Sequence, residues 1–403
     1  MSDPLGQSQV LPYLVGLSKL GFKFHLISFE KKELLYKSKK LIQEICDVSD
    51  ISWYPLDYTK KPPVLSTIND LRKMIKLSRS IVQKEEVQII HARGHLITSI
   101  AAEKVIGKKP LKYVFDMRGF WADERVEGGL WSMNNPLFRR IFAYFKRKEL
   151  DFISKADAII TLTDRAKEMI VKWQKKKGIG NAPIVTIPCC ADLGHFNYEN
   201  YSTYKINQFK STLNIEEETI VFSYLGSVGT WYMLPEMLKF FGLIHEKKPK
   251  TLFLFITKEP KETIYLEAAK CNIPEASLKI VSSERSEVPN YLSICDYSMF
   301  FIRPTFSKSG SSPVKHGEAL GMGLPIICNH NIGDVDNIVR DSKSGFIVDV
   351  DNDTMNLGSF VPQKLSTESK KINRAAAEKY YNLEKGIQLY SEVYKKILKY
   401  ENN

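Results

Sequence analysis

The chain has 403 residues, of which 43% are hydrophobic and 26% are charged, and its formal net charge is +12. Because a single hydrophobic core stops growing at roughly 250 to 300 residues, we expect two domains. No run of about 18 apolar residues predicts a membrane-spanning helix, and no signal peptide precedes the first predicted helix. With no internal repeat, the sequence predicts a globular cytoplasmic protein. No recognised nucleic-acid motif accompanies the basic charge, so no nucleic-acid partner is expected.

The six cysteines lie in apolar or strand-like surroundings, without a Cys-x-x-Cys pair or a histidine at metal-ligand spacing. They predict reduced, mostly buried thiols. Lysines and arginines gather in short runs, at 31–32, 37–40, 60–61, 139–140, 146–148 and 172–177. Such runs suit an anionic lipid head group, a polyprenyl diphosphate or nucleic acid, but also an ordinary solvated surface, and the charge pattern alone leaves these readings open.

Apolar β-formers alternate with helical segments along the whole chain, which predicts parallel sheets with helices on both faces. In the first half we expect strands at 24–29, 87–90, 113–116, 157–163 and 185–188, helices at 65–84, 97–106, 136–155 and 164–176, and a polar aromatic loop up to about residue 135. In the second half we expect strands at 219–225, 251–256, 278–281, 297–302 and 345–348, and helices at 234–245, 288–294 and 383–400.

The most informative segment runs from Ser312 to Ile327, with the sequence Ser-Pro-Val-Lys-His-Gly-Glu-Ala-Leu-Gly-Met-Gly-Leu-Pro-Ile-Ile. It predicts a short apolar helix, a Gly-x-Pro turn and a buried strand, so Glu318 should project from the mouth of an α/β crevice. A carboxylate there can accept hydrogen bonds from the two hydroxyls of a ribose. An acid favoured by the dipole at a helix N-terminus is the alternative explanation.

This segment resembles the donor-site signature of the family 4 type glycosyltransferases, Glu-Ala-x-Ala/Gly-x-Gly-x-Pro followed by β-branched residues. The segment from Asp3 to Gly21 resembles the glycine loop and first helix of the same enzymes. The two motifs stand in the expected order. The resemblance implies a retaining, hexosyl-type transferase of bacterial or archaeal surface-glycan biosynthesis with the GT-B fold, in which two Rossmann-like, doubly wound parallel-sheet domains face each other across a cleft.

The resemblance also implies the domain boundaries. Residues 1–190 would form the acceptor-side domain, residues 191–382 the nucleotide-sugar domain, and residues 383–403 a helix that packs back on the first domain. The family's first strand would end where Met1 and Ser2 stand. We therefore expect the N-terminal sheet to lack a central member, which puts the activity of a chain without that strand in doubt.

The donor-binding residues that the resemblance implies are Gly6, Gln7, Gly226, Ser227, Arg303, Ser311, Ser312, Lys315 and Glu318. Two features depart from the family. The Arg-x4-Lys pair that neutralises the pyrophosphate is missing, because residues 226–236 contain no basic side chain. Gly310 stands in place of the first glutamate of the Glu-x7-Glu pair, which leaves the sugar undefined and also allows a monophosphate donor.

A leaving diphosphate needs fixed cations or dipoles. The nearest candidates for this charge are Arg303, Lys308 and Lys315, together with an anion nest in the turn at 309–312. For any one lysine, ordinary solvent exposure is the alternative.

On the acceptor side, the segment after the strand at 113–116 combines acids, arginines and large aromatic rings, which suit sugars and anionic acceptors. We expect Arg93, Asp116 and Arg118 to be catalytic, ahead of the flanking His91 and His95. Trp121, Asp123 and Glu124 are the expected acceptor-binding residues. The alternative is an internally salt-bridged loop.

The resemblance implies transfer of a sugar from a nucleotide sugar to a glycan or a polyprenyl-linked acceptor, with a possible contact to an anionic membrane at the inner face of the cell membrane. No cofactor and no metal are expected, since the Asp-x-Asp sequences at 334–336 and 349–351 belong to loops, and that motif holds a metal in a different transferase fold. The alternatives are a non-catalytic subunit of the same fold and a sugar-nucleotide epimerase.

Overall fold

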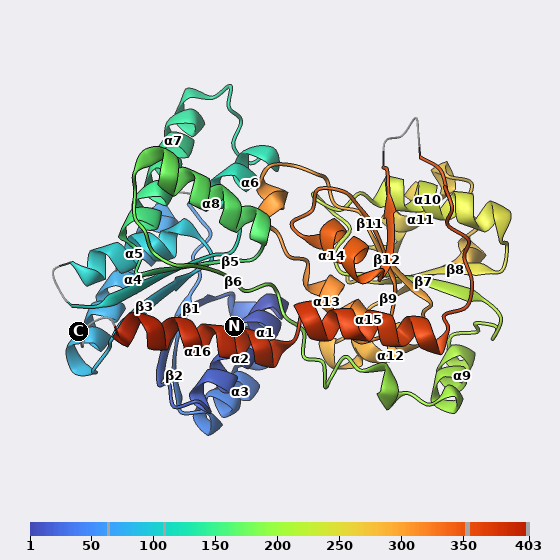
Figure 1. Ribbon diagram of the computed structural model, residues 1–403, viewed down its shortest axis with the longest axis horizontal. Helices are drawn as coiled ribbons and strands as arrows, with labels where there is room; N and C mark the ends of the chain where they lie inside the picture. Colours follow the sequence, from blue (N-terminus) through green and yellow to red (C-terminus); the bar gives the residue numbers. More distant parts are fainter. Residues whose placement is uncertain (63–64, 108–109, 351–354, 400–403) are drawn as a thin grey trace. The chain divides into compact units, whose positions relative to one another are not determined.

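The computed structural model describes residues 1–62, 65–107, 110–350 and 355–399, and it divides into two compact units (Figure 1). Unit 1 comprises Met1–Pro188 and the C-terminal segment from Leu383; unit 2 comprises Cys189–Asn382. The sequence placed the boundary after residue 190, two residues beyond the observed one. Each unit combines parallel strands with surrounding helices, so the predicted α/β class with two Rossmann-like parallel-sheet domains is confirmed.

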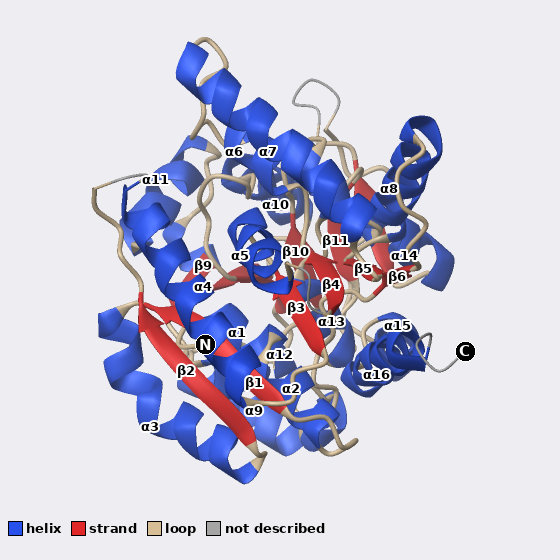
Figure 2. Cartoon of the chain, turned by 90° about the vertical axis from the view of Figure 1, so that its left-hand side faces the viewer, coloured by secondary structure: helices blue, strands red, loops and turns tan. Residues whose placement is uncertain are grey.

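Unit 1 contains two separate parallel sheets. Its strands are β1 (Phe24–Glu30), β2 (Ile51–Asp57), β3 (Ile89–Arg93), β4 (Lys112–Met117), β5 (Ala158–Thr161) and β6 (Ile184–Thr186). Strands β3 to β6 form one sheet in chain order, whereas β1 pairs only with β2. Figure 2 shows this pair lying apart from the four-stranded sheet. Among the described residues, no strand joins the β1–β2 pair to the four-stranded sheet.

The helices of unit 1 are α1 (Pro4–Gln9), α2 (Leu11–Ser18), α3 (Lys32–Val48), α4 (Leu65–Lys84), α5 (Leu96–Ile106), α6 (Trp121–Glu127), α7 (Pro136–Lys155), α8 (Asp164–Lys177) and α16 (Leu383–Lys399). Helices α5, α7 and α8 pack against the core of the larger sheet, where Phe115, Phe152 and Ile159 are buried. Helix α16 packs against α2 and buries Tyr390 and Tyr394.

Two segments that we expected to be loops are helical. The predicted glycine loop after Asp3 is helix α1, because the Asp3 carboxylate accepts a 2.7 Å hydrogen bond from the Gly6 amide and Pro4 stands in the first turn. The predicted loop before residue 135 contains α6. Asp123 and Glu124 lie in the first turn of α6, where acids complement the helix dipole, and Gly128 ends it.

Unit 2 is built on one six-stranded parallel sheet with the order β12-β11-β10-β7-β8-β9. Its strands are β7 (Ile220–Leu225), β8 (Thr251–Ile256), β9 (Leu278–Val281), β10 (Tyr297–Phe300), β11 (Ile326–Asn329) and β12 (Gly345–Val348). Its α-helices are α9 (Thr203–Thr212), α10 (Leu234–Lys247), α11 (Lys261–Lys270), α12 (Val288–Ser293), α13 (Val314–Gly321), α14 (Val335–Ser342) and α15 (Thr367–Tyr380), with short 3-10 turns at Tyr198–Asn200, Glu275–Ser277, Arg285–Glu287 and Ser307–Gly310.

The strand order of unit 2 reverses between β7 and β10. From β7 the chain runs outward through β8 to β9, and it then returns to place β10 on the other side of β7. Loops on opposite faces of such a sheet diverge at the reversal and leave a crevice beyond the carboxyl ends of the two strands. The segments that follow β7 and β10 therefore define where a ligand of unit 2 is expected.

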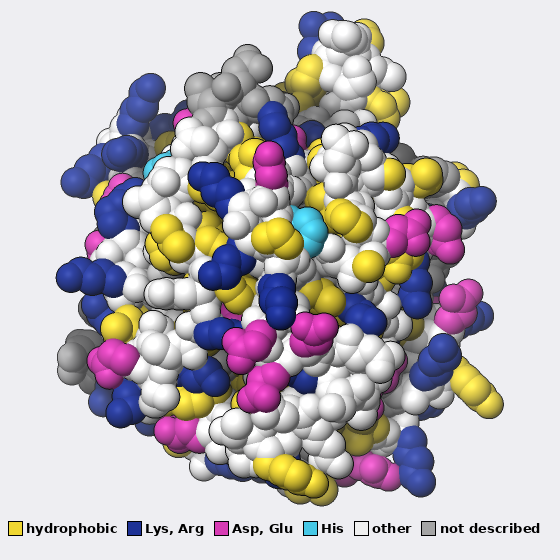
Figure 3. Space-filling view, turned by 90° about the vertical axis from the view of Figure 1, so that its right-hand side faces the viewer, with side chains coloured by type: hydrophobic (Ala, Val, Ile, Leu, Met, Phe, Trp, Pro, Cys, Tyr) yellow, Lys and Arg dark blue, Asp and Glu magenta, His cyan; other side chains and the backbone are white. Residues whose placement is uncertain are grey.

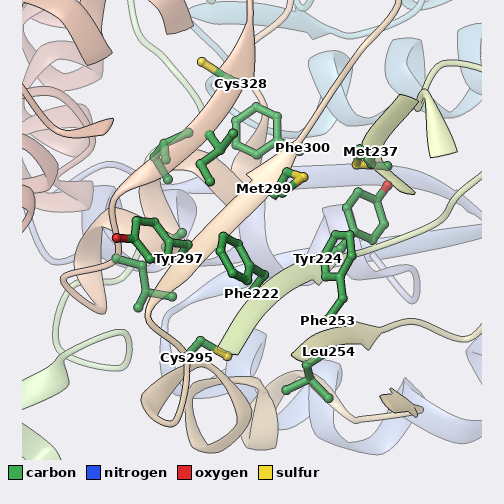
Figure 4. Close-up of a cluster of buried hydrophobic side chains, with 14 of the residues drawn as sticks. Phe222, Tyr224, Met237, Phe253, Leu254, Cys295, Tyr297, Met299, Phe300 and Cys328 are labelled. Atoms are coloured by element: carbon green, nitrogen blue, oxygen red, sulfur yellow. The ribbon is translucent and has the colours of Figure 1, made fainter. Parts of the chain in front are cut away.

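Aromatic side chains fill the core beneath this crevice (Figure 4). Phe222 and Tyr224 on β7 lie beside Phe253 on β8 and Met299 and Phe300 on β10, and all five are buried. Interiors of this kind are packed to crystal-like density and tolerate little displacement. The two strand ends at the crevice are thus held on a stiff base. None of the described helices of either unit is long and apolar enough to cross a membrane.

Close packing at one glycine fixes helix α13 in unit 2. A Cβ atom at Gly317 would lie 2.8 Å from Cβ of Tyr381, and the hydroxyl of Tyr381 lies 2.9 Å from Nδ1 of His316. The Cβ atom of Tyr381 moves only with its backbone, so a rotation of the Tyr381 side chain cannot relieve the first contact. Gly317 therefore lets α13 approach Tyr381 closely enough for this bond to form.

We predict that Gly317→Ala lowers the free energy of unfolding by about 1 to 3 kcal/mol, the usual cost of overpacking a tight site. Gly229→Ala is the matched control, because a Cβ there meets no atom within 4 Å, and it should change stability by less than about 1 kcal/mol. Urea unfolding followed by circular dichroism measures both. Equal stability of the two variants would show that Gly317 does not set this packing.

Candidate functional site

A glycine turn follows the central strand β7. Gly226 has a φ of 113°, which favours glycine, and its amide donates to the carbonyl of Ile256 at 3.0 Å. The hydroxyl of Tyr224 donates to the carbonyl of Ser227, and the amide of Arg303, just beyond β10, donates to the carbonyl of Trp231 at 2.9 Å. Hydrogen bonds from both neighbouring strands thus hold the turn at the crevice.

Helix α13, which follows β10, directs a lysine at this turn. The Nζ atom of Lys315 lies 3.8 Å from the ring centre of Tyr232 and 4.2 Å from that of Tyr224. It also lies 3.4 Å from the point where a Cβ of Gly226 would stand. The lysine that the sequence proposed for the diphosphate is therefore next to the glycine turn.

The environment of Lys315 is unusual for an ammonium group. Its side chain is buried, and Nζ has no hydrogen-bond partner among the described residues. Burial lowers the pKa of Lys315 well below its usual value, and the carboxylate of Glu318 only partly opposes this effect. The faces of two tyrosine rings stabilise the charged form through cation–π contacts, but they do not replace an anionic partner.

Glu318 lies one turn further along α13 and is also buried. Its Oε1 atom is 2.7 Å from Nη1 of Arg285, yet Oε1 accepts no properly oriented hydrogen bond. The contact is therefore an ion pair with poor N–H alignment, which leaves the carboxylate able to accept from another donor. Arg285 follows strand β9 and packs over the ring of Phe196 at 5.3 Å.

Three polar side-chain atoms on α13 share one property: each is buried and lacks a hydrogen-bond partner among the described residues. They are Nζ of Lys315, Nε2 of His316 and Oε1 of Glu318. Buried polar groups in native proteins are nearly always bonded, so each exception needs an explanation. For Lys315 and Glu318, an anionic, hydroxylated ligand in the crevice would supply the missing partners. Burial lowers the pKa of His316 to about 3, so this ring is neutral.

The other expected donor residues have different surroundings. Arg303 is exposed at the end of β10, and no described residue forms an ion pair with it. Ser311 follows a 3-10 turn rather than an open nest, and the hydroxyl of Ser312 accepts a 3.2 Å bond from the amide of Cys189. Gly6 and Gln7 belong to helix α1 of unit 1. Unit 2 thus assembles Gly226, Ser227, Lys315 and Glu318, and the hydroxyl of Ser312 is already engaged.

In unit 1 the three expected catalytic residues form one buried ion cluster. Asp116 is fully buried at the end of β4, and its Oδ2 accepts from Arg93 at 2.8 Å and from the Tyr390 hydroxyl at 2.8 Å. Nε2 of His91 lies 3.1 Å from the same oxygen, while Arg118 lies 3.5 Å from Oδ1. Tyr390 belongs to α16, so the cluster ties the C-terminal helix to the end of the sheet.

Burial alone would raise the pKa of Asp116, but the charges of Arg93 and Arg118 and the bond from His91 outweigh it and hold the pKa well below its usual range. The carboxylate is therefore ionised and saturated with donors. Direct contact between Asp116 and a substrate would break these bonds. Within unit 1, the geometry assigns Asp116 to positioning Arg93, Arg118 and α16.

The expected acceptor residues lie on α6 and face α7. Trp121 packs edge-on against Phe145 and Trp131, with ring centres 4.9 Å and 5.4 Å apart. Asp123 accepts a 2.7 Å bond from Lys146. This part of the segment is internally paired, as the alternative reading of the sequence predicted. Glu124 lies in the first turn of the same helix.

Sequence reasoning missed the partners that complete both clusters. Tyr224 and Tyr232 flank the glycine turn after β7, Arg285 follows β9, and Tyr390 lies near the C-terminus. The only available signal was the position of Arg285 just beyond a strand end, where ligand contacts concentrate. Within the described residues no group of three or more His, Cys, Asp or Glu could hold a metal ion; Asp351 lies outside them.

Two family models match the chain. The model described as "Glycosyl transferases group 1" matches residues 205–360 in unit 2, and the model described as "Glycosyltransferase Family 4" matches residues 9–195. A comparison with curated protein sequences gives no match.

Solved structures similar to the chain include a glycosyltransferase from Rickettsia africae, with a TM-score of 0.70 and 16% identity over 98% of this chain and 97% of the other. Anabaena Alr3699/HepE in complex with UDP and glucose has a TM-score of 0.66 at 10% identity, covering 97% and 96%. WaaG, a glycosyltransferase involved in lipopolysaccharide biosynthesis, has a TM-score of 0.57 at 11% identity, covering 96% and 92%. At these identities the similarity shows the GT-B fold.

We predict that Asp116→Asn lowers the free energy of unfolding by about 3 kcal/mol at pH 7, because it leaves two arginines without their buried counter-ion. A depressed folded-state pKa stabilises the protein above the unfolded pKa of about 4, and this contribution is lost as the pH falls below that value. The variant should therefore lose less stability than the wild type between about pH 5 and pH 3.

The matched control is Asp57→Asn, which removes an exposed ion pair with Lys32 at 3.9 Å and should change stability by less than about 1 kcal/mol. Urea unfolding across this pH range measures both variants. An Asp116→Asn protein as stable as the control would rule out a structural role for the cluster.

Proposed function

We propose that this chain, which carries domains of the glycosyltransferase group 1 and family 4 types in the GT-B fold, transfers a hexosyl group from a nucleotide-activated donor to a glycan or polyprenyl-linked acceptor. The transfer retains the anomeric configuration and needs no metal. The place of the reaction is the cytoplasm, at the inner face of the membrane that presents the acceptor. A bacterial or archaeal surface glycan is the expected product.

One observation carries the proposal: helix α13 brings an unpaired buried ammonium and an available buried carboxylate to the glycine turn after β7. Lys315 faces Gly226, and Glu318 stands one turn further along the same helix. In open parallel sheets this is where ligands bind. A nucleoside diphosphate offers the two complementary groups in one molecule, a charged diphosphate and a ribose diol.

In this assignment the glycine turn and Lys315 bind the diphosphate, and Glu318 accepts hydrogen bonds from the ribose hydroxyls. Arg285 holds the Glu318 carboxylate in place, so it is a positioning residue. Lys315 takes the part of the absent Arg-x4-Lys pair, and we assign Arg303, Ser311 and Ser312, in the segment after β10, to the same donor site. The donor role of Gly6 and Gln7 in unit 1 stays a prediction from the sequence. The rings of Tyr224 and Tyr232 keep the ammonium aimed at the turn.

The chemistry needs little more than position and charge. The bond between the anomeric carbon and the phosphate oxygen breaks, a bond from the acceptor oxygen forms on the same face, and the acceptor proton passes to the leaving phosphate. Negative charge grows on the diphosphate, so a preorganised cation lowers the barrier. On the acceptor side, Trp121, Asp123 and Glu124 would bind the acceptor, and Arg93 and Arg118, held by Asp116, would position it.

We predict that one of five nucleotides, the diphosphates UDP, GDP, dTDP and ADP or the monophosphate CMP, raises the melting temperature of the chain. A ligand of the folded state stabilises it by RT ln(1 + [L]/Kd). Glu318→Gln and Lys315→Met should each weaken the binding of that nucleotide roughly 10- to 100-fold, the range for a lost charged hydrogen bond.

The controls for these two variants are Glu275→Gln and Lys279→Met, which change the same residue types elsewhere in unit 2 and should bind normally. Circular dichroism checks the fold of every variant. If no nucleotide shifts the melting temperature of the wild type, the donor site is refuted and the non-catalytic subunit becomes the better explanation. If Lys315→Met binds the nucleotide with normal affinity, the diphosphate does not bind at Lys315.

Binding of the diphosphate should also depend on pH in a particular sense. Since the pKa of Lys315 is lowered in the free protein, its charge is lost at a lower pH than that of an ordinary lysine. Nucleotide affinity should therefore decrease with rising pH already below the range in which an ordinary lysine loses its charge, and Lys315→Met should flatten this dependence. A titration by isothermal calorimetry measures it; an unchanged slope in the variant would exclude Lys315 as the cause.

Once the nucleotide is known, incubation with its sugars and a polyprenyl-phosphate-linked acceptor tests the reaction. Proton NMR of the product reports whether the anomeric configuration is retained, and activity in excess EDTA should equal activity with magnesium. Conversion of the donor sugar without any acceptor would instead identify an epimerase.

A further inference from the structure

The first half of helix α7 projects from the rest of unit 1. In Figures 1 and 2 its N-terminal end and the preceding loop stand away from the four-stranded sheet. Its second half anchors the helix, because Phe152 and Ile153 are fully buried in the core. The projecting part therefore extends from a fixed base and presents its own side chains outward.

This projecting part is apolar where a solvated helix would be polar. Leu130 and Leu137 are exposed by 59% and 61%, and Tyr144 by 38%. Phe138 and Phe142 are only half-buried, and they do not pack against the core around Phe115 and Phe152. Single exposed apolar residues are ordinary, but several on one protruding element are typical of an interaction surface.

Basic residues alternate with the apolar ones on the same face. Leu137, Arg140, Tyr144 and Arg147 are spaced three and four residues apart, so they form one stripe along the exposed side of α7. Arg139 is exposed beside them. We call Leu137, Arg140, Tyr144 and Arg147 the α7 stripe.

The charge of this region has one sign. No Asp or Glu occurs between Glu127 and Glu149, and Arg139, Arg140 and Arg147 form no ion pair with any described residue. The two nearby lysines differ, since Lys146 bonds Asp123 and Lys148 bonds Glu103. On the face drawn in Figure 3, by contrast, basic and acidic side chains are interspersed. The α7 stripe thus combines unneutralised positive charge with exposed apolar area.

We propose that the α7 stripe and Leu130 form the surface by which this protein binds an anionic lipid bilayer. A helix with apolar and aromatic side chains interleaved with arginines lies in the plane of the interface. Leu130, Leu137 and Tyr144 enter the boundary between head groups and acyl chains. Arg140 and Arg147 extend their guanidinium groups to the lipid phosphates.

The positive charge of the α7 stripe favours an anionic lipid bilayer over a second copy of the chain as the partner. A second copy of the chain would bring the same arginines to the interface, where like charges repel. A lipid surface with phosphatidylglycerol supplies the complementary charge and the apolar layer together, and each basic residue near it strengthens binding about fivefold.

The test measures co-sedimentation of the full-length chain with vesicles of phosphatidylcholine, with and without phosphatidylglycerol. No nucleotide or sugar is present, so the outcome is independent of the transferase proposal. We expect binding only to the anionic vesicles. Arg140→Glu with Arg147→Glu should weaken it at least tenfold, roughly as two lost basic contacts require, and Leu137→Glu with Tyr144→Glu should also weaken it several-fold. Replacing both arginines by lysine should preserve it.

The matched control is Lys175→Glu with Lys176→Glu on helix α8 of the same unit, where both lysines are exposed and the change in charge is equal. Melting temperatures verify the fold of each variant. Absence of binding to anionic vesicles, or an equal loss in the α8 control, would overturn the proposal. So would concentration-dependent dimers that Leu137→Glu abolishes without any vesicle binding, since the surface would then serve a second copy.

Discussion

The strand-order reversal between β7 and β10 is the constraint on which the candidate site depends. It brings the turn after β7 and the segment after β10 to the same edge of the sheet, although many residues separate them along the chain. Gly226 leaves room for the ammonium of Lys315, and the packing of Gly317 on Tyr381 fixes the helix that carries it. A shift of either element would separate the ammonium from the turn. The densely packed aromatic core beneath them resists such a shift.

The buried charged groups of the two units differ in how fully they are hydrogen-bonded. In unit 1 the carboxylate of Asp116 is saturated by two arginines, a histidine and a tyrosine, and it joins the C-terminal helix to the sheet. In unit 2, among the described residues, the ammonium of Lys315 contacts two aromatic rings and has no hydrogen-bond partner, and Glu318 has one misaligned partner, Arg285. A saturated cluster stabilises a fold, whereas an unsaturated one has bonding capacity left for a ligand. This difference is why the donor assignment is best supported in unit 2.

The regular elements were largely predictable from the sequence, and the errors have physical causes. Helices α4 and α7 begin and end at the predicted residues, since long amphipathic periodicity with a proline or cap gives a strong signal. Helices α1 and α6 were missed because they are short and depend on local capping, as with the Asp3 side chain. The separate β1–β2 sheet follows from which strands find partners in space, and no local pattern encodes that choice.

For the site, the sequence by itself determined the chemistry of the residues: Glu318 before a Gly-x-Pro turn, a lysine three residues earlier, and a glycine turn after a buried strand. Only the tertiary structure decided which of them meet. It placed the ammonium of Lys315 against the glycine turn, gave Glu318 the partner Arg285, and added Tyr390 of α16 to the donors around Asp116. Residue types carry local information, but burial and pairing depend on contacts between distant segments, and these contacts set the charge, the pKa and the remaining bonding capacity of each group.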